Sequence, residues 1–524
     1  MCRKCFLTLI LIGAVCLTVA GQTTGIIPEP QRVEFLQGDC VLDERTPVER
    51  KLVAALPIDT NMDQGYILEI LPNRVTLTAT TETGLYYAGL SLDQLRRHFQ
   101  GRVPCMKITD YPALKYRGWM DDISRGPVPT MEFLKREIAI LAQYKMNFFN
   151  LYTEHMFKLD PLPDIAPADG LTAEQVKELE EYAAQFHIEF FGNQQCLAHA
   201  EKTLRIPFYQ DIADTKFNVN PGAYETREFL QYQLETVANA YTSPFFNINC
   251  DETEALGNGK ARQYVESHGG ASQVYVEHIR WVHDILRKQG KRVMMWGDIA
   301  AKDPAIVAQL PEDMMLIVWM YAPSDSYEDM FEPFTKAGFE FMVAPGMSMW
   351  GTVFPSYDTY TKNIANLVRD GHRHGAMGMM NTAWDDSGES LFNTTWHGML
   401  WAAEMAWKPL KETVLAKADQ ERTARLEDFN RRFQQDFYYP EEVRELMRLY
   451  ESCGIPLFFQ NGSLYESIWD NYASKVSQEY FDKNKTLLQQ THQLFGKIPQ
   501  NWDMDPTHNA VQRFLPYVFH RQDY

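Results

Sequence analysis

Two adjacent carboxylates, Asp251 and Glu252, are the residues in this sequence best placed to do chemistry. They end an apolar, strand-like run that begins at Phe245, and a Gly/Asn-rich loop at 257–259 follows them. A buried parallel strand delivers catalytic acids to the rim of a barrel in this way. The pair could instead simply open the next helix, since acidic residues suit a helix N-terminus. The position of the pair in the chain favours the first interpretation.

Short apolar segments alternate with longer amphipathic ones from residue 116 onward, which predicts an α/β fold of the (β/α)8 TIM-barrel type. The strand candidates are 116–121, 147–154, 188–194, 245–252, 292–298, 315–321, 339–344 and 378–384. Helical patterns between them include 130–144, 172–186, 226–240, 272–289 and 360–373. A doubly wound open sheet is the rival fold, but no Gly-rich phosphate loop follows the first strand.

Most of the predicted strands end in polar or large aromatic residues. These ends are Asp121-Asp122, Tyr152-Thr153-Glu154, Asn193-Gln194, Asp251-Glu252, Trp296-Gly297-Asp298, Trp319-Met320-Tyr321 and Trp384-Asp385-Asp386. The carboxyl ends of barrel strands converge on one pocket, where such barrels do their chemistry. A pocket rich in carboxylates and tryptophans, with no metal-ligand spacing, fits glycoside hydrolysis.

The regions that flank the barrel carry no clustered chemistry. Residues 22–112 predict a small α+β domain, with a hairpin formed by 66–70 and 74–79 and a helix packed on it. The barrel is assigned to 113–408. Residues 409–524 are charged and helical, with helices expected at 412–437, 441–451 and 464–494. These helices are expected to pack against the side of the barrel or to form a homodimer surface.

The composition narrows the classes of partner. The 524 residues carry 50 basic and 69 acidic side chains, a net charge of −19, which repels nucleic acids and anionic membranes. No later segment approaches the length of a membrane span. Aromatic residues make up 13% of the chain. Flat rings of this kind suit sugar binding, although most of them are expected in the core.

The first 21 residues read as a secretory signal peptide. A basic start at 1–4 precedes an apolar run at 6–19 and small residues at 20 and 21. We therefore expect secretion across the inner membrane into the periplasm. Lipoprotein anchoring at Cys16 is the less favoured alternative, because the residues before it suit lipidation poorly.

The cysteines left after cleavage are an odd, scattered set without a CxxC pair: Cys40, Cys105, Cys196, Cys250 and Cys453. They suggest neither a disulfide framework nor a zinc site. Cys250 could be a nucleophile, but no histidine stands near it in the sequence, and a buried strand cysteine is the simpler reading.

Several motifs resemble the family 20 glycoside hydrolases, the β-N-acetylhexosaminidases. They are Tyr116-Arg117-Gly118-Trp119-Met120-Asp121 on the first strand, His199 after the third and Asp251-Glu252 on the fourth. The region 26–90 resembles that family's small N-terminal domain, which implies a zincin-like α+β fold. Segments 151–154, 197–199 and 251–257 are similar to the hexosaminidase D-like and bacterial exo-acting branch.

The resemblance implies a substrate-assisted mechanism. The 2-acetamido oxygen of a terminal GlcNAc or GalNAc attacks the anomeric carbon, so no enzyme nucleophile, cofactor or metal is needed. Glu252 would be the general acid and then the base. Asp251 would hold the acetamido N–H and stabilise the positive charge that develops.

The resemblance also implies supporting roles for other residues. Arg117 would grip sugar hydroxyls, with a structural salt bridge as the alternative. His199 and Glu154 would form a relay that supports the acid. Asp386 would bind the outer hydroxyls.

Aromatic residues complete the expected site. Trp319, Trp350 and Trp384 are candidates to wall the acetamido pocket. The family's usual tyrosine after the seventh strand has no clean match, so Tyr321 is the first candidate to polarise the acetamido group. Tyr357 and Tyr360 are its rivals, and this departure bears on specificity more than on the reaction.

Two other functions stay open at this stage. A catalytically silent barrel that binds amino sugars would need neither carboxylate, so the presence of Asp251 and Glu252 argues against it. A conventional two-carboxylate glycosidase would use a second acid, for example Glu154, as its nucleophile.

Overall fold

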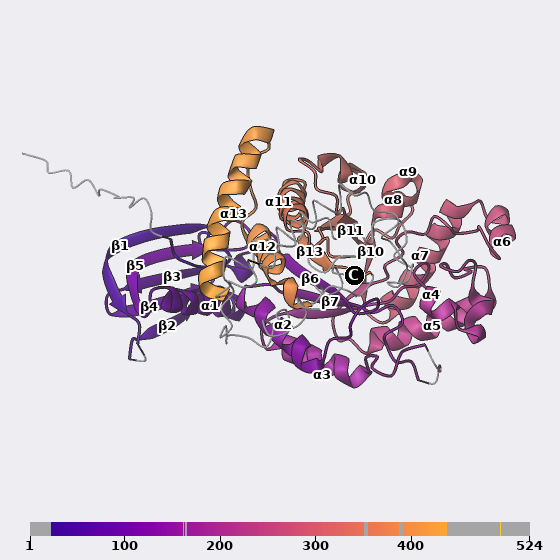
Figure 1. The fold of residues 1–524 in the computed structure, drawn as a ribbon, viewed down its shortest axis with the longest axis horizontal. Coiled ribbons are helices and arrows are strands. Elements are labelled where there is room, and N and C mark those ends of the chain that lie inside the picture. The colour runs from indigo at the N-terminus through magenta and orange to yellow at the C-terminus, as the bar shows by residue number, and fades with distance from the viewer. Residues whose placement is uncertain are drawn as a thin grey trace, which may run out of the picture.

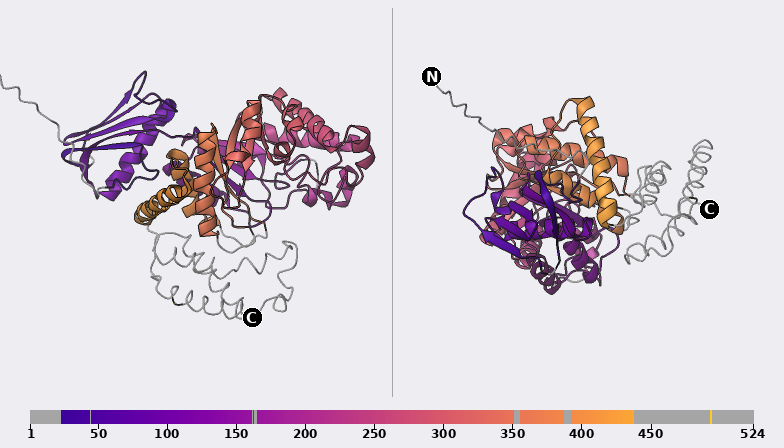
Figure 2. Two further views of the ribbon diagram at one scale, coloured as in Figure 1. Left: turned by 90° about the horizontal axis from the view of Figure 1, so that it is seen from above. Right: turned by 90° about the vertical axis from the view of Figure 1, so that its left-hand side faces the viewer.

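The computed structural model describes residues 23–437, except 44, 161, 163–164, 351–354 and 387–391, and also residue 493. A five-stranded sheet and a closed eight-stranded barrel form the two main units. They lie side by side, and the long helix α13 (Leu415–Phe437) runs over their junction (Figures 1 and 2). The predicted signal peptide and the helices expected at 441–451 and 464–494 lie outside these residues, apart from residue 493.

The N-terminal unit is a mixed sheet covered by one helix. Its strands are β1 (Arg32–Val41), β2 (Val48–Leu52), β3 (Tyr66–Leu71), β4 (Arg74–Ala79) and β5 (Arg102–Asp110), in the spatial order β1-β5-β3-β4-β2. The predicted hairpin is the antiparallel pair β3–β4. Helix α1 (Glu82–His98) starts at Thr81, whose hydroxyl caps the amide of Gly84, and it buries its apolar face on the sheet.

The second unit is the predicted TIM barrel. Its parallel strands are β6 (Tyr116–Asp122), β7 (Phe148–Tyr152), β8 (Glu189–Asn193), β9 (Phe245–Asn247), β10 (Arg292–Trp296), β11 (Met315–Trp319), β12 (Glu340–Ala344) and β13 (Gly378–Ala383). Strand β13 pairs with β6 and closes the barrel. The predicted fold class is confirmed.

Helices surround the barrel in the alternating order that its strands require. They are α2 (Met131–Gln143), α3 (Ala173–Ala184), α4 (Glu201–Leu204), α5 (Tyr224–Asn239), α6 (Arg262–Ser267), α7 (Ala271–Lys288), α8 (Asp298–Lys302), α9 (Pro304–Val307), α10 (Glu332–Ala337), α11 (Tyr357–Arg373) and α12 (Trp396–Trp407). Short 3-10 helices occur at η1 (Met62–Gln64), η2 (Pro207–Ile212), η3 (Glu328–Met330) and η4 (Phe392–Thr394).

The fourth barrel strand is shorter than predicted. Strand β9 ends at Asn247, whereas the apolar pattern predicts a strand to residue 252. Asn249, Cys250 and Glu252 take positive φ angles of 59°, 61° and 49°, a region that interrupts a strand. The carboxylates therefore stand on a tightly turned segment just beyond the strand.

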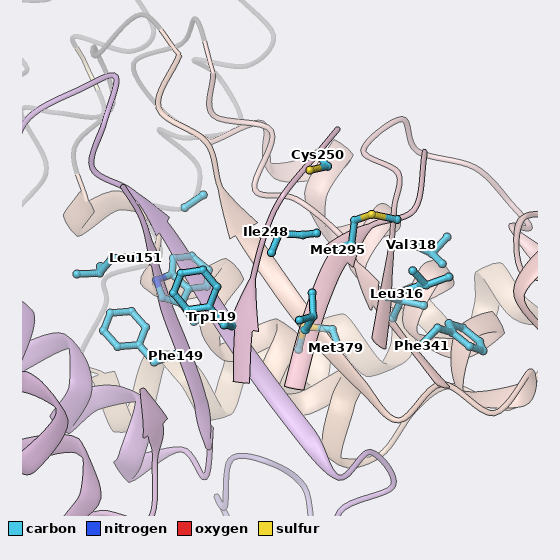
Figure 3. Packing of buried hydrophobic residues seen from close by; sticks show 14 of the residues in the cluster. Trp119, Phe149, Leu151, Ile248, Cys250, Met295, Leu316, Val318, Phe341 and Met379 are labelled. Atoms are coloured by element: carbon cyan, nitrogen blue, oxygen red, sulfur yellow. The ribbon is translucent and has the colours of Figure 1, made fainter. Parts of the chain in front are cut away.

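Apolar side chains from alternate strand positions fill the space between the barrel and its helices. Trp119, Phe149, Ile248 and Met295 belong to this layer, which Figure 3 shows from close by. A separate, smaller cluster fills the inside of the barrel below the strand ends, and the rings of Phe148 and others stack within it. Two packed layers hold each strand end at a fixed position.

Helix α13 joins the two units through ion pairs. Arg432 on this helix contacts Glu404 on α12 at 2.7 Å and donates a hydrogen bond to the Ile26 carbonyl at 2.7 Å. Burial alone would raise the pKa of Glu404, but Arg432 and Arg425 lower it to about 2. The carboxylate is therefore held in its charged form between the N-terminal segment and the barrel.

Two features are absent from the part of the chain that the structure describes. None of its helices combines the length and hydropathy needed to cross a membrane. Likewise, no group of three or more histidine, cysteine or acidic side chains among these residues is arranged to hold a metal ion.

Candidate active site

A cavity of about 580 Å³ opens at the carboxyl ends of the barrel strands. Its walls combine acids, bases and aromatic rings: Arg125, His199, Glu201, Lys202, Phe217, Asp251, Glu252, Trp296, Trp319, Tyr321, Trp350, Trp384 and Asp386. This volume is in the usual range for small-molecule sites. Polar groups converging among apolar walls are suited to binding a sugar.

The two adjacent carboxylates meet the same nitrogen of His199. Its Nε2 atom lies 3.4 Å from Asp251 Oδ2 and 3.5 Å from Glu252 Oε2. Their environments differ, because the side chain of Asp251 is 10% exposed and that of Glu252 is 54% exposed. One acid is held inside the wall and the other faces the cavity.

The charges of the pair and of His199 depend on each other. Burial would lower the pKa of His199, but Asp251, Glu252 and Glu154 raise it to about 11. Burial would raise the pKa of Asp251, but the charge of His199 and the hydrogen bonds that Asp251 accepts from His199, the backbone and Gln195 hold that pKa below its ordinary value. At neutral pH the site therefore contains a charged imidazolium beside an ionised Asp251.

Backbone contacts hold the turned segment that carries the carboxylates. The amide of Glu252 donates to Asp298 Oδ2 at 3.1 Å, and the Tyr275 hydroxyl donates to the Cys250 carbonyl at 2.9 Å. Burial and the nearby charge of Asp251 raise the pKa of Asp298 to about 6. Asp298 follows the fifth barrel strand and positions Glu252 through its main chain.

Aromatic rings form one wall of the cavity. Tyr321 stacks on Trp319 with ring centroids 5.1 Å apart and lies 5.2 Å from the ring of Trp350. Trp384 donates its indole N–H to the Tyr321 hydroxyl at 2.6 Å. Trp296 donates its indole N–H to Asn249 Oδ1 at 3.0 Å, and this hydrogen bond fixes the Trp296 ring beside the turned segment. The structure brings all three predicted tryptophans to the cavity.

The tyrosine rivals are separated by position. Tyr321 lines the cavity, whereas Tyr357 and Tyr360 lie on α11 and are buried. The Tyr360 hydroxyl is 2.9 Å from His397 Nδ1, and Tyr357 bonds to Asn430. Burial raises the pKa of Tyr321, so its phenol stays protonated at neutral pH. That oxygen accepts a hydrogen bond from Trp384, and Thr382 also hydrogen-bonds to the phenol.

Arg125 and Asp386 form an ion pair across the rim of the cavity. Arg125 also donates to Asp122 at 2.7 Å, and its guanidinium lies 4.9 Å from the centroid of Trp384 and 5.2 Å from that of Tyr152. Burial and neighbouring acids raise the pKa of Asp386, although Arg125 opposes the shift. These contacts fix a planar, charged donor where hydroxyl groups of a sugar would lie.

Arg117 is not part of the cavity, which contradicts its predicted sugar-binding role. It is fully buried, and its guanidinium donates to the Lys145 and Leu114 carbonyls, to Gln64 Oε1 and to the Tyr87 hydroxyl at 2.7–3.0 Å. Arg117 is the second residue of β6, so it lies at the amino end of the barrel, against the N-terminal unit. None of these partners is a carboxylate, so the alternative of a structural salt bridge is also wrong.

Glu154 and His199 are neighbours, but no hydrogen bond joins them in the part of the chain that the structure describes. Both line a second, smaller cavity of about 20 Å³, which has room for one water molecule. Burial, opposed by Arg125, raises the pKa of Glu154 to about 8, and the Tyr152 hydroxyl donates to its Oε1 at 3.1 Å. At neutral pH Glu154 is therefore mostly protonated.

Sequence reasoning missed several cavity residues, of which Arg125 is the most informative, and it gave no role to Trp296, although Trp296 stood among the strand ends expected at the pocket. Arg125 stands three residues after the first strand, and Trp296 ends the fifth strand. Both obey the rule that barrel chemistry lies at the carboxyl ends of strands. Lys202 and Phe217 come from the long connection after β8 and carried no signal. The ring of Phe217 packs edge-on against His199 at 4.5 Å.

Two family models match the chain. The model described as "Glycosyl hydrolase family 20, domain 2" matches residues 52–111. The model described as "Glycosyl hydrolase family 20, catalytic domain" matches residues 114–410, more than half of the chain. The second match spans the whole barrel and every cavity residue named above.

Curated relatives of the chain are named beta-hexosaminidases. A beta-hexosaminidase of Vibrio furnissii is 26% identical over 373 residues, 56% of this chain and 61% of that protein. A beta-hexosaminidase of Akkermansia muciniphila is 28% identical over 248 residues, 42% of this chain and 48% of that protein. The matched segments thus span less than two thirds of either relative.

Solved structures share the fold. The beta-N-acetylhexosaminidase of Bacteroides fragilis aligns with a TM-score of 0.61 at 18% identity, over 78% of this chain and 96% of that one. The chitobiase of Flavobacterium johnsoniae aligns with a TM-score of 0.62 at 15% identity, over 95% and 92% of the two chains. At these identities the likeness shows the arrangement of domains and strands.

Proposed function

The chain belongs to glycosyl hydrolase family 20, and we propose that its barrel is an exo-acting β-N-acetylhexosaminidase that removes terminal β-linked GlcNAc or GalNAc from glycans. The Vibrio furnissii and Akkermansia muciniphila relatives, both named beta-hexosaminidases, support this activity. The cavity among the strand ends supports a single sugar residue as the bound group.

One observation carries the proposal, namely that two adjacent carboxylates beside one histidine differ in exposure. Asp251 is buried, with a lowered pKa, while Glu252 faces the cavity. Two acids with distinct environments can hold distinct roles in one reaction. Asp251 would stay ionised throughout, and Glu252 would exchange a proton with the leaving group and with water.

In the first step the substrate's acetamido oxygen forms a bond to the anomeric carbon as the glycosidic C–O bond breaks. Glu252 gives its proton to the departing oxygen. The positive charge that develops on the ring and the acetamide is stabilised by Asp251, which also accepts a hydrogen bond from the acetamido N–H. Tyr321 is placed to donate its phenolic proton to the acetamido oxygen and to orient it.

In the second step water attacks the anomeric carbon and the bond to the acetamido oxygen breaks. Glu252, now ionised, takes the proton from that water and returns to its starting state. Two displacements restore the β configuration, so the product retains it. The charge of His199 lies beside both carboxylates at each stage and limits their mutual repulsion.

The rest of the cavity selects the sugar. The aromatic wall of Trp296, Trp319, Trp350 and Trp384 offers flat apolar faces to the sugar ring and to the acetamido methyl group. The Arg125–Asp386 pair presents donors and acceptors to the outer hydroxyl groups. A substrate without the acetamido group would lose both the internal nucleophile and this wall.

The two alternatives fit the geometry less well. A conventional glycosidase would need an ionised nucleophile, but Glu154 is buried, mostly protonated at neutral pH and not among the lining residues of the larger cavity. A barrel that only binds sugars would not need Glu252 beside the charged His199, nor the lowered pKa of Asp251 next to it.

A substrate panel tests the proposal. Release of p-nitrophenol is measured from the β-GlcNAc, β-GalNAc and plain β-glucoside derivatives, with and without a thiazoline mimic of the oxazoline intermediate. The proposal expects turnover of an acetamido sugar alone and inhibition by the thiazoline. Turnover of the glucoside would overturn the mechanism, and silence on all three would favour the binding protein.

We also propose that the protein is secreted to the periplasm and belongs to the bacterial exo-acting branch. The basic and apolar pattern of residues 1–21 supports secretion, and segments 151–154 and 251–257 support the branch. Fractionation of expressing cells tests the location. Sedimentation of the purified protein tests whether it forms a homodimer.

A further inference from the structure

Two buried cysteines meet directly behind the carboxylate pair. The Sγ atoms of Cys196 and Cys250 lie 3.1 Å apart, and both side chains are closed off from solvent. Cys250 is the residue before Asp251, and it lies beyond Ile248 on the extension of β9, as Figure 3 shows. These two cysteines, far apart in the sequence, are therefore neighbouring thiols in the fold.

Barrel topology explains the meeting, although the two residues are 54 positions apart. Strands β8 and β9 are parallel neighbours in which Asn193 faces Asn247, and the pairing continues in a hydrogen bond from the Gln194 amide to the Asn247 carbonyl at 3.0 Å. Each cysteine stands three residues beyond these partners. Neighbouring strands run about 4.8 Å apart, within the Cα separation of roughly 4.4–6.8 Å that a disulfide spans.

The surroundings make the two thiols chemically unequal. Burial raises the pKa of Cys250 well above its ordinary value. Burial acts on Cys196 in the same direction, but the hydrogen bond from Cys250 and the nearby His278 lower its pKa to about 6. His278 Nε2 lies 2.8 Å from the Cys196 carbonyl oxygen. In the finished barrel Cys196 is therefore the more acidic of the two thiols.

We propose that Cys196 and Cys250 form a disulfide bond that ties the third barrel strand to the fourth behind the carboxylate pair. The oxidant is a small-molecule or protein disulfide. The thiolate of one cysteine attacks one of its sulfur atoms and releases a first thiolate; the other cysteine, losing its proton, then attacks the sulfur of the first cysteine and releases a second thiolate. The two cysteines lose two protons and two electrons, and the oxidant becomes two thiols.

Burial sets the order of events. Neither sulfur is open to a bulky reagent in the finished barrel, so the exchange takes place while β8 and β9 assemble. Once formed, the bond is shielded from reductant until the protein unfolds. The sulfur atoms need to approach by only about 1 Å to reach the bond length. The crosslink therefore leaves the carboxylates in place and acts on stability.

The bond would reinforce a contact that already exists. Gln195, the residue before Cys196, has its Nε2 atom 3.4 Å from Asp251 Oδ1, and His199 follows three residues later. A covalent link one residue away from each partner holds both loops together. The proposal does not depend on the proposed glycosidase activity.

Peptide mapping tests the proposal. The full chain is refolded with oxidised glutathione, denatured, treated with iodoacetamide to block free thiols and digested with trypsin. Peptides 178–202 and 228–260 each contain one cysteine. The expected result is their recovery as one linked species, lighter by two hydrogen atoms than the sum of the two peptides and separated by dithiothreitol. Recovery of both peptides in alkylated form would overturn the proposal.

Two variants and a melting curve complete the test. Cys196→Ser should leave Cys250 alkylated and should melt at the temperature of the reduced wild type, below that of the oxidised protein. Cys105→Ala, which removes a buried cysteine of the N-terminal unit, should keep the linked species. If the two peptides are not linked but the protein turns over hexosaminides, only the disulfide proposal is rejected. If the peptides are linked but the protein does not turn over hexosaminides, only the proposed activity is rejected.

Discussion

Replacing Glu154 with glutamine distinguishes a protonated, positioning carboxyl from a catalytic nucleophile. Burial, partly opposed by Arg125, raises the pKa of Glu154 from 4.5 to about 8. A carboxyl with that pKa is mostly protonated at pH 7, and a glutamine side chain matches it closely in size and polarity. We therefore expect Glu154→Gln to fold at neutral pH and to keep its kcat/KM within about 10-fold of the wild-type value.

The raised pKa fixes the sign and size of a pH-dependent difference in stability. From pH 4.5 to about 8 the folded protein keeps a proton on Glu154 that the unfolded chain has lost, so the free energy of unfolding falls as the pH rises. The loss is about 1.4 kcal/mol per pH unit, or about 3 kcal/mol between pH 5 and pH 7. Glutamine does not titrate, so the variant escapes this loss.

Urea unfolding and kinetics measure both consequences. The stability of Glu154→Gln relative to wild type should rise by about 1.4 kcal/mol with each pH unit between pH 5 and pH 7, while kcat/KM at pH 7 falls by less than about 10-fold. A stability difference that stays constant with pH would refute the protonated state. A loss of activity by several orders of magnitude, with a covalent glycosyl-enzyme in the wild type, would identify Glu154 as the nucleophile.

Three further predictions follow from the same contacts. Glu252→Gln should lower kcat about 10²- to 10⁴-fold, with partial rescue on substrates that have good leaving groups. Asp251→Asn should lower kcat by about as much, without that rescue. If both variants kept near-wild-type activity, the assignment of the two catalytic residues would be wrong. Arg125→Ala should lower kcat/KM about 10- to 100-fold. Arg117→Ala should lower the melting temperature and leave the KM of the folded fraction unchanged. The opposite pattern in kinetics and melting curves would place Arg117 in the site. Glu404→Gln should reduce the free energy of unfolding by about 3 kcal/mol at pH 7, because two arginines keep its pKa at about 2 and that stabilisation is lost only as the pH falls towards this value; urea unfolding with no change would contradict it.

The barrel was predictable because its strands are buried on both faces and read as apolar runs of strand length. The end of β9 was not, since Ile248 and Cys250 continue the apolar pattern while the backbone turns through positive φ angles. Periodicity reports burial, and both residues are indeed buried. It does not report the dihedral angles that present Asp251 and Glu252 to the cavity.

The rule that barrel sites lie at the carboxyl ends of the strands would have replaced Arg117 with Arg125 in the predicted site. Arg117 lies near the start of the first strand and Arg125 beyond its end, so only the second can reach a pocket at the carboxyl ends. The prediction of Arg117 instead followed the resemblance of the 116–121 motif to the family. The meeting of Cys196 with Cys250 had no local signal, because it depends on the register between two strands.

The measurement that tests the account most directly compares N-acyl variants of one substrate. p-Nitrophenyl β-GlcNAc derivatives with zero, one, two or three fluorine atoms on the acetamido methyl group differ in the nucleophilicity of the acetamido oxygen. If that oxygen attacks the anomeric carbon beside Asp251, kcat/KM falls steeply with each fluorine. Rates that stay level across the series would contradict the substrate-assisted mechanism and assign the attack to a group of the enzyme.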